Sequence, residues 1–154
     1  MPKTSAALLL FRRREPLEVL IAHMGGPFWA RKDAGAWSIP KGEYTSEPPL
    51  DAALREFAEE MGSPAPAGDV IPLGSVKQSG GKVVTAFALE GDFDLTGFRS
   101  NTFEMEWPRG SGRMQEFPEV DRAEWVTVDV AREKLVKGQI PVLDALRDHL
   151  GSTT

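Results

Sequence analysis

Residues 42–62 read GEYTSEPPLDAALREFAEEMG, and this stretch decides how the chain folds. Its apolar residues recur every three or four positions from Leu50 to Met61, which is the spacing of one buried stripe on an α-helix. The two adjacent prolines before Leu50 suit the first turn of a helix, and Ser46 is the candidate N-cap. Gly62 suits the C-terminal position, which favours positive φ. The stretch therefore predicts an amphipathic helix with one buried face.

This helix carries three glutamates on one face. At 100° per residue, Glu56, Glu59 and Glu60 fall inside an arc of about 100° beside the apolar stripe. Their like charges oppose one another, and Arg55 can neutralise only part of that repulsion. Glutamate oxygens suit Mg²⁺ or Mn²⁺, which commonly shares its remaining positions with phosphate. The spacing alone favours a solvated acidic face over a metal site, because glutamate is a good helix former and acidic helix faces are commonly solvated.

The run from Gly42 to Ser63 resembles the Nudix box of the Nudix hydrolases. In that family the pattern is a Gly, five residues, Glu, seven residues, Arg-Glu, an apolar residue, any residue, Glu-Glu, any residue, Gly and an aliphatic residue. The chain matches this pattern at Glu47, Arg55, Glu56, Phe57, Glu59, Glu60 and Gly62. It departs from the pattern twice, because only four residues separate Gly42 from Glu47 and because Ser63 occupies the final aliphatic position.

The resemblance implies a set of metal ligands. Glu56 and Glu60 would be the main ligands of Mg²⁺ or Mn²⁺, and Glu59 would be a further ligand or the base that activates water. The carbonyl of Gly42 would join them. The shortened segment after Gly42 lies in the loop before the helix, so the helical glutamates keep their register.

Further catalytic roles are implied for residues around these ligands. Arg55 would orient a glutamate through a salt bridge, and Glu47 would brace the loop against the helix. Surface pairing and a favourable charge at the helix N-terminus are the structural alternatives for these two residues. Many members of the family take their base from a later loop, where this chain offers Glu104, Glu106, Glu116 and Glu119. Glu116 and Glu119 rank first, since they lie in a Gly/Arg-rich loop and just before a predicted strand.

Four residues are candidates for binding the substrate. Arg109 and Arg113 lie among glycines and would reach phosphate oxygens. Trp29 and Trp107 lie in or near loops and would stack on a base. The alternative is that such loop arginines only promote solubility.

The rest of the chain predicts a sheet and a second helical region. Apolar runs predict strands at residues 5–11, 17–23, 37–40, 70–78, 82–89, 102–107 and 122–126. Residues 108–118 read as an exposed loop, and helical spacing returns over residues 130–150 with a break near Gly138. The fold class expected is α/β, a Nudix-like α/β/α sandwich with a mixed β-sheet, in a single domain over residues 1–154.

Composition limits the partners. The formal net charge is −5, which disfavours long nucleic acid, and no stretch approaches the roughly 20 apolar residues of a membrane span. The chain has no cysteine, which excludes disulfides and thiolate metal sites. We therefore expect a cytoplasmic protein. The resemblance implies in addition a small nucleotide-like substrate for a monomer or homodimer.

The resemblance implies cleavage of a diphosphate bond in a nucleoside diphosphate linked to another moiety. Nucleoside triphosphates, dinucleoside polyphosphates and nucleotide sugars all fit this description. The first alternative is a catalytically silent Nudix-like domain that binds a nucleotide or a protein. The second is a structural domain whose acidic helix is only a solvated face.

Overall fold

The computed structural model describes residues 4–78 and 81–151. Its elements in chain order are β1 (Thr4–Arg12), β2 (Glu18–Met24), β3 (Trp37–Ser38), β4 (Lys41–Glu43), α1 (Pro49–Met61), β5 (Val70–Lys77), β6 (Val83–Glu90), η2 (Leu95–Gly97), β7 (Thr102–Glu106), β8 (Met114–Pro118), β9 (Val120–Thr127), α2 (Val128–Lys134), η3 (Lys137–Gln139) and α3 (Ile140–Gly151). The predicted strands match β1, β2, β5, β6, β7 and β9 to within a few residues at each end.

A seven-stranded mixed sheet forms the centre of the molecule. Its main path runs β3-β2-β1-β6-β5, while β4 pairs with β1 and β9 pairs with β2. Strand β1 runs parallel to β6 and antiparallel to β2 and β4. This arrangement places β4, which precedes the Nudix-like loop, at the end of the sheet where β1 begins.

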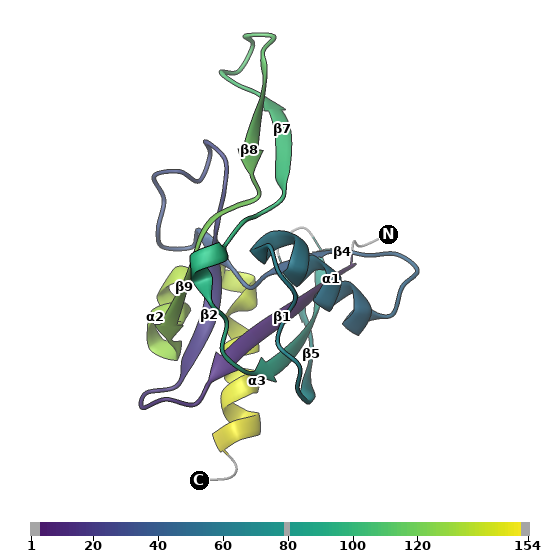
Figure 1. Ribbon diagram of the computed structural model, residues 1–154, viewed down its shortest axis with the longest axis vertical. Coiled ribbons are helices and arrows are strands. Elements are labelled where there is room, and N and C mark those ends of the chain that lie inside the picture. Colours follow the sequence, from purple (N-terminus) through teal and green to yellow (C-terminus); the bar gives the residue numbers. More distant parts are fainter. Residues whose placement is uncertain (1–3, 79–80, 152–154) are drawn as a thin grey trace.

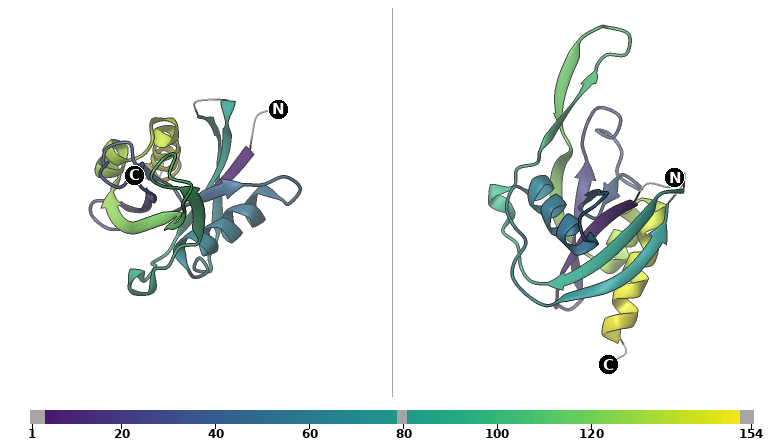
Figure 2. Two further views of the ribbon diagram at one scale, coloured as in Figure 1. Left: turned by 90° about the horizontal axis from the view of Figure 1, so that it is seen from above. Right: turned by 90° about the vertical axis from the view of Figure 1, so that its right-hand side faces the viewer.

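The two faces of the sheet are covered by different helices, as Figure 2 shows. Strand β1 is an almost uninterrupted apolar run because it is buried on both sides. Its residues Leu8 and Leu10 pack in a core with Phe57 of α1, whereas Leu9 packs in a second core with Leu143 of α3. The predicted α/β/α sandwich with a mixed sheet is therefore confirmed.

Helix α1 begins one residue before the predicted apolar stripe. Its N-cap residue is Pro48, which makes no side-chain capping hydrogen bond, so the prediction that Ser46 is the N-cap is wrong. The reason is that proline already fixes a φ compatible with the helix start and has no amide that needs a partner. At the other end Gly62 adopts φ 86° and donates its amide to the carbonyl of Ala58. A side chain at Gly62 would also collide with Arg99.

Strands β7 and β8 form a hairpin that projects from the body of the molecule (Figure 1). The prediction that residues 108–118 are all loop is wrong, because Met114–Pro118 is a strand paired with β7. The cross-strand pair of Phe103 and Phe117 gives the hairpin an apolar face. The carboxylate of Glu106 accepts hydrogen bonds from two glycine amides of the intervening turn, which explains why a glycine-rich segment joins two paired strands.

None of the helices in the described part of the chain is long and apolar enough to cross a membrane.

Candidate metal centre and adjoining cavity

Arg55 is the centre of an ion-pair network that joins the loop before α1 to the acidic face of the helix. Its guanidinium contacts Glu47 at 2.5 Å, Glu56 at 2.9 Å and Glu59 at 3.3 Å. Hydrogen bonding to Arg55 holds the pKa of Glu47 below its usual range. The planar guanidinium has enough donors for all three carboxylates, so one side chain fixes the loop before α1 to two glutamates of the helix.

Glu60 lies deeper and outside that network. Burial raises the pKa of Glu60 to about 8, and repulsion by the carboxylates of Glu119 and Glu56 adds to this effect. The backbone amide of Lys41 donates a hydrogen bond to Glu60, which offsets part of the shift. Burial likewise raises the pKa of Glu56, whose side chain is only 14% exposed. The site therefore contains more buried negative charge than its own cationic groups neutralise.

Gly42 gives Glu56 the room that it needs. Strand β4 places Gly42 opposite Ala6 of β1, and an added Cβ at Gly42 would overlap the carboxyl group of Glu56. The Gly42 backbone and the Glu56 carboxylate are therefore in close approach although fourteen positions separate them in the sequence. A residue without a side chain is required here for steric reasons, since no positive φ is involved.

The residues fit a divalent cation in charge and in chemistry. Carboxylate oxygens are the donors that Mg²⁺ and Mn²⁺ prefer, and a cation would favour the ionised form of Glu60, which burial and the charges of Glu119 and Glu56 disfavour. Within residues 4–78 and 81–151, no three histidine, cysteine or acidic side chains already converge as a ligand set. Glu56 and Glu59 instead share Nη1 of Arg55.

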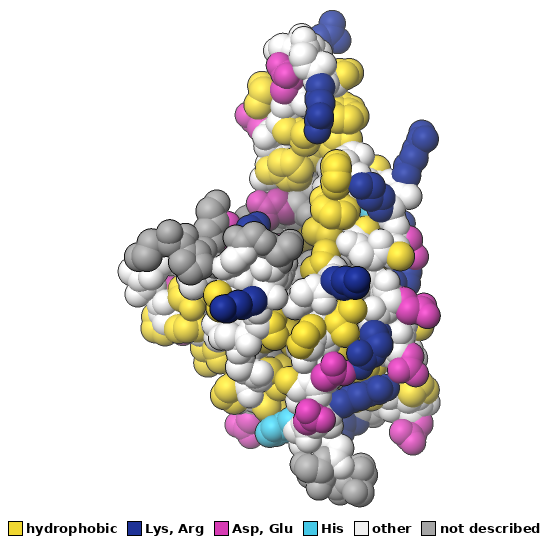
Figure 3. Space-filling view, turned by 180° about the vertical axis from the view of Figure 1, so that it is seen from behind, with side chains coloured by type: hydrophobic (Ala, Val, Ile, Leu, Met, Phe, Trp, Pro, Cys, Tyr) yellow, Lys and Arg dark blue, Asp and Glu magenta, His cyan; other side chains and the backbone are white. Residues whose placement is uncertain are grey.

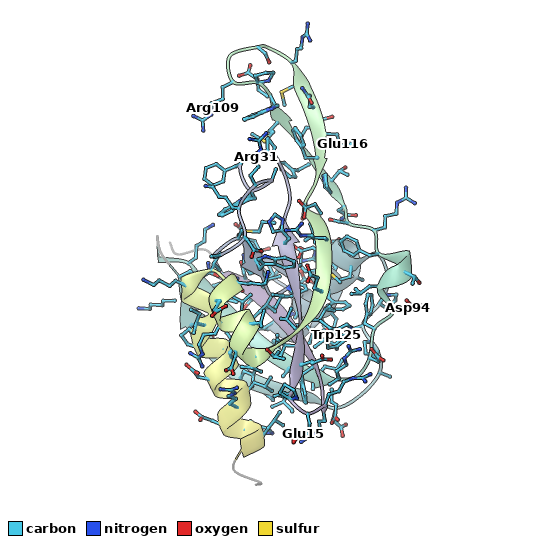
Figure 4. All side chains as sticks on the ribbon, turned by 90° about the vertical axis from the view of Figure 1, so that its left-hand side faces the viewer. Glu15, Arg31, Asp94, Arg109, Glu116 and Trp125 are labelled. Carbon is cyan, nitrogen blue, oxygen red and sulfur yellow. The ribbon has the colours of Figure 1, made fainter. Side chains whose placement is uncertain are left out.

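The two leading candidates for the base lie in different places. Glu119 lies close enough to repel both Glu56 and Glu60. The backbone of Asn101 connects Glu119 to the helix. Its carbonyl accepts a hydrogen bond from the Glu119 amide, and its amide donates one to the carbonyl of Glu59 near the end of α1. Glu116 lies on the projecting hairpin, opposite Glu104, as Figure 4 shows. The fold thus brings Glu119, and not Glu116, to the helical glutamates.

The candidate substrate-binding residues are also separated. Trp107 and Arg113 pair through their backbones near the end of the hairpin, and Arg109 lies close to its tip (Figure 4). Hydrophobic side chains cover much of the hairpin in Figure 3. Trp29, by contrast, packs against the core beside α3 and lines a cavity.

That cavity has a volume of about 430 Å³ and adjoins the carboxylates. It is lined by Met24, Trp29, Ser38, Lys41, Gln78, Lys82, Val136, Lys137, Gly138 and Gln139. Lys41 belongs to both places, because its backbone amide donates a hydrogen bond to Glu60 and the residue also lines the cavity. The cavity is therefore the space beside the acidic site that a ligand can occupy.

The loop between β2 and β3 contributes Trp29 to the lining of the cavity, and hydrogen bonds to buried side chains hold this loop in place. His23 is fully buried, pairs through Nδ1 with Asp121 at 2.8 Å and donates from Nε2 to the carbonyl of Lys32 at 2.7 Å. Asp33 accepts a hydrogen bond from the Trp37 indole. These contacts fix the end of the loop that carries Trp29.

Sequence reasoning missed most of the cavity. Trp29 was among the sequence candidates, but Lys82, Lys137 and Gln139 lie far from the box in the sequence, so no local pattern joins them to it. Among the lysines of the cavity, only Lys41 is adjacent to the box, because it immediately precedes Gly42.

Comparisons with known proteins agree with this architecture. A sequence profile of the NUDIX domain matches residues 1–146. No curated protein sequence matches the chain.

Several solved structures have the same fold. The NUDIX domain of Shewanella oneidensis NrtR, in complex with ADP ribose, is 17% identical with a TM-score of 0.65, and the match covers 97% of this chain and 89% of that one. The C. elegans Ap4A hydrolase is 17% identical with a TM-score of 0.63, over 96% and 98% of the two chains. The MutT protein of Methanosarcina mazei is 21% identical with a TM-score of 0.62, over 96% of both chains. At these identities the structures establish the fold, and the profile match over nearly the whole sequence establishes the kinship: this chain belongs to the NUDIX domain family.

Proposed function

We propose that the protein hydrolyses a diphosphate bond in a nucleoside diphosphate linked to another moiety, with Mg²⁺ or Mn²⁺ as cofactor. The observation that carries this proposal is the half-buried Glu60, which is repelled by the like charges of Glu56 and Glu119 and lies beside a cavity lined by lysines. An acidic cluster that repels itself is unfavourable for the fold, and it suits the binding of a cation together with an anionic substrate.

Glu56 and Glu60 would be the principal metal ligands, with Glu59 and the Gly42 carbonyl as further ligands. When bound, the cation would neutralise charge on the diphosphate and lower the pKa of a coordinated water. Arg55 and Glu47 would act as positioning residues, because Arg55 ties the loop to the helix and fixes the carboxylate of Glu56. The ion pairs of Arg55 with Glu47, Glu56 and Glu59 support these positioning roles.

Glu119 is the favoured base, with Glu59 as the alternative. A carboxylate near Glu56 and Glu60 would accept a proton from the attacking water as its oxygen bonds to phosphorus and the anhydride P–O bond breaks. Its connection through Asn101 to the end of α1 would hold it at a constant distance from the ligands.

The cavity would hold the nucleoside. Trp29 offers an aromatic surface, and Ser38 and Gln78 offer polar groups for the edge of a base. The solved NUDIX domain bound to ADP ribose and the Ap4A hydrolase complex support a nucleotide-like substrate for this chain. The substituent on the far side of the diphosphate is open among triphosphates, dinucleoside polyphosphates and nucleotide sugars.

The test is a substrate panel in Mg²⁺ or Mn²⁺, with phosphate and nucleotide products measured for wild type, Glu56→Gln and Glu60→Gln. We expect turnover that falls at least 100-fold in both variants, as is common when a main contributor to transition-state stabilisation is removed. Turnover that survives both substitutions would contradict the ligand assignment.

A matched pair of variants identifies the base. Glu119→Gln should lower kcat at least 100-fold with little change in metal affinity, within the range of general-base contributions. Glu116→Gln, on the hairpin, should leave kcat within twofold. The reverse order would exclude Glu119.

The alternative of a silent binding domain has one feature in its favour, the shortened loop after Gly42. It predicts tight nucleotide binding without turnover for every member of the panel. The presence of all the helical glutamates of the family pattern favours the enzyme.

A further inference from the structure

The cavity beside the acidic site is strongly cationic, although the chain as a whole is acidic. Three of its ten lining residues are lysines, Lys41, Lys82 and Lys137, and none is acidic. Among the residues that the structure describes, no ion pair joins any of these three lysines to a carboxylate. The charge of Lys41 is attracted by Glu60, Glu43 and Glu56, which leaves Lys82 and Lys137. In a protein with a net charge of −5, these two lysines beside one cavity require an explanation.

The fold actively gathers these lysines. Lys82 precedes β6, and its carbonyl accepts a hydrogen bond from the Gln78 amide at 2.8 Å. Gly138 packs so closely on Gln78 that an added Cβ would overlap its side chain, which holds η3 and Lys137 against the end of β5. Lys41 comes from the opposite direction, out of β4, and the charge of Lys82 is near enough to act on it.

The polar amide at the floor of the cavity is already satisfied. The Gln139 side chain is buried, accepts from the Ile39 amide at 2.8 Å and donates to the Ser38 hydroxyl at 3.0 Å. The groups left for a ligand are therefore mainly the ammonium groups, whose natural partner is a phosphate.

We propose that Lys82 and Lys137 bind a phosphate on the nucleoside half of the substrate, in addition to the diphosphate that is cleaved. This inference rests on the proposed function and narrows its substrate class to nucleotides whose ribose is itself phosphorylated. Lys41, between the two sites, would face the diphosphate. A volume of about 430 Å³ is in the range of pockets that enclose a small organic ligand.

The test compares substrates that differ by one phosphate. ADP ribose is matched with ADP ribose 2′-phosphate, and dephospho-coenzyme A with coenzyme A, which carries a 3′-phosphate. We expect kcat/KM to favour the phosphorylated member of at least one pair by about tenfold or more, the typical effect of one charge-assisted hydrogen bond. The preference should fall to within twofold in the Lys82→Gln/Lys137→Gln double variant.

The control is Lys77→Gln, which removes the same charge from an exposed position on β5 that does not line the cavity. It should keep the preference. A preference below fivefold in both pairs, or one that survives in the double variant, overturns the inference while leaving the proposed function intact. Thermal unfolding of each variant verifies that the fold is retained.

A binding measurement separates this inference from the proposed function. If neither these four compounds nor any member of the wider substrate panel is hydrolysed, the proposed function fails, and calorimetric titration of the four compounds still tests the cavity. Binding of the phosphorylated member at least fivefold more tightly, with loss of that difference in the double variant, supports the inference. Equal affinities overturn it.

Discussion

Replacing Glu60 by glutamine should stabilise the metal-free protein while it abolishes metal binding. Burial and the charges of Glu119 and Glu56 raise the pKa of Glu60 to about 8, against an ordinary value of 4.5. A carboxyl group whose pKa is raised by folding favours the folded state below its unfolded pKa, and that contribution is lost as pH rises through the folded pKa. Glutamine has the same shape and no charge to lose, so it removes this dependence.

The magnitude follows from the two pKa values. At pH 7 the unfolded chain ionises Glu60 completely, whereas the folded protein keeps it mostly protonated, which destabilises the fold by about 3 kcal/mol relative to pH 4. Glu60→Gln should therefore match wild type near pH 4 and exceed its free energy of unfolding by about 2 to 3 kcal/mol at pH 7. For a domain of this size, that difference raises the Tm by roughly 5 to 10 °C.

The assay is thermal or urea unfolding of chelator-treated protein at pH 4.5, 7 and 8, followed by the same series with excess Mg²⁺ or Mn²⁺. Cation that binds only the folded state adds stability in proportion to the logarithm of its concentration over its Kd. Wild type should gain this stabilisation, and Glu60→Gln should not. Glu124→Gln, at an exposed position on β9, is the matched control and should behave as wild type at every pH.

Two results would refute the reasoning. The first is a Glu60→Gln variant that is no more stable than wild type at pH 7 without metal, because the buried charge would then be well compensated. The second is a stability difference that does not change between pH 4.5 and 8, because titration of Glu60 would then not be its origin.

Three further predictions follow from the contacts of the site. Arg55→Lys should lower kcat at least tenfold, because a lysine cannot bridge Glu47 and Glu56 as the guanidinium does, while urea unfolding changes by less than about 1 kcal/mol, as for other exposed ion pairs. Gly42→Ala should weaken metal binding roughly tenfold or more in calorimetric titration, since its Cβ displaces the Glu56 carboxyl; unchanged affinity would contradict the close approach. Leu143→Ala should lower the free energy of unfolding by about 2 to 5 kcal/mol through a core cavity, and a tenfold change in metal affinity of the folded variant would show that the two sides of the sheet are coupled.

Helix α1 was predictable because its periodicity and the residues at both of its ends indicate the same element. Its apolar stripe, its prolines and Gly62 all indicate one helix, and the same periodicity that buries Phe57 places Glu60 beside it. The depth of Glu60 was not predictable, because it depends on the Lys41 amide and on Glu119, which reach it from other strands. Local patterns therefore identified the acidic face, and only the tertiary structure distinguishes Glu60, which contacts the Lys41 amide, from Glu59, which pairs with Arg55.

The hairpin shows the opposite case. Glycine and arginine dominate residues 108–113 and hide the alternation that continues in β8, where Phe117 pairs with Phe103. The glycine-rich composition predicts a long loop, whereas the structure has a short turn. Glu106 of the preceding strand stabilises this turn by accepting hydrogen bonds from its glycine amides, and the turn sequence itself does not show this contact. This error left Glu116 and Glu119 equally ranked as candidates for the base. The structure separates them, because Glu116 lies on β8 of the projecting hairpin and Glu119 lies just before β9 of the central sheet.

Lys41 connects the acidic site to the cavity. Its charge is attracted by the carboxylates of Glu60, Glu43 and Glu56 and repelled by Lys82. Glu56 and Glu60 would repel a diphosphate in the absence of cations, whereas Lys82 and Lys137 line the cavity. Because Lys41 is adjacent to Gly42 in β4, pairing of that strand with β1 fixes the place of Lys41 between the two regions. Under the proposed function, a ligand that spans both regions would be held at one end by the lysines of the cavity, and its diphosphate would face the glutamates in the register that β4 sets.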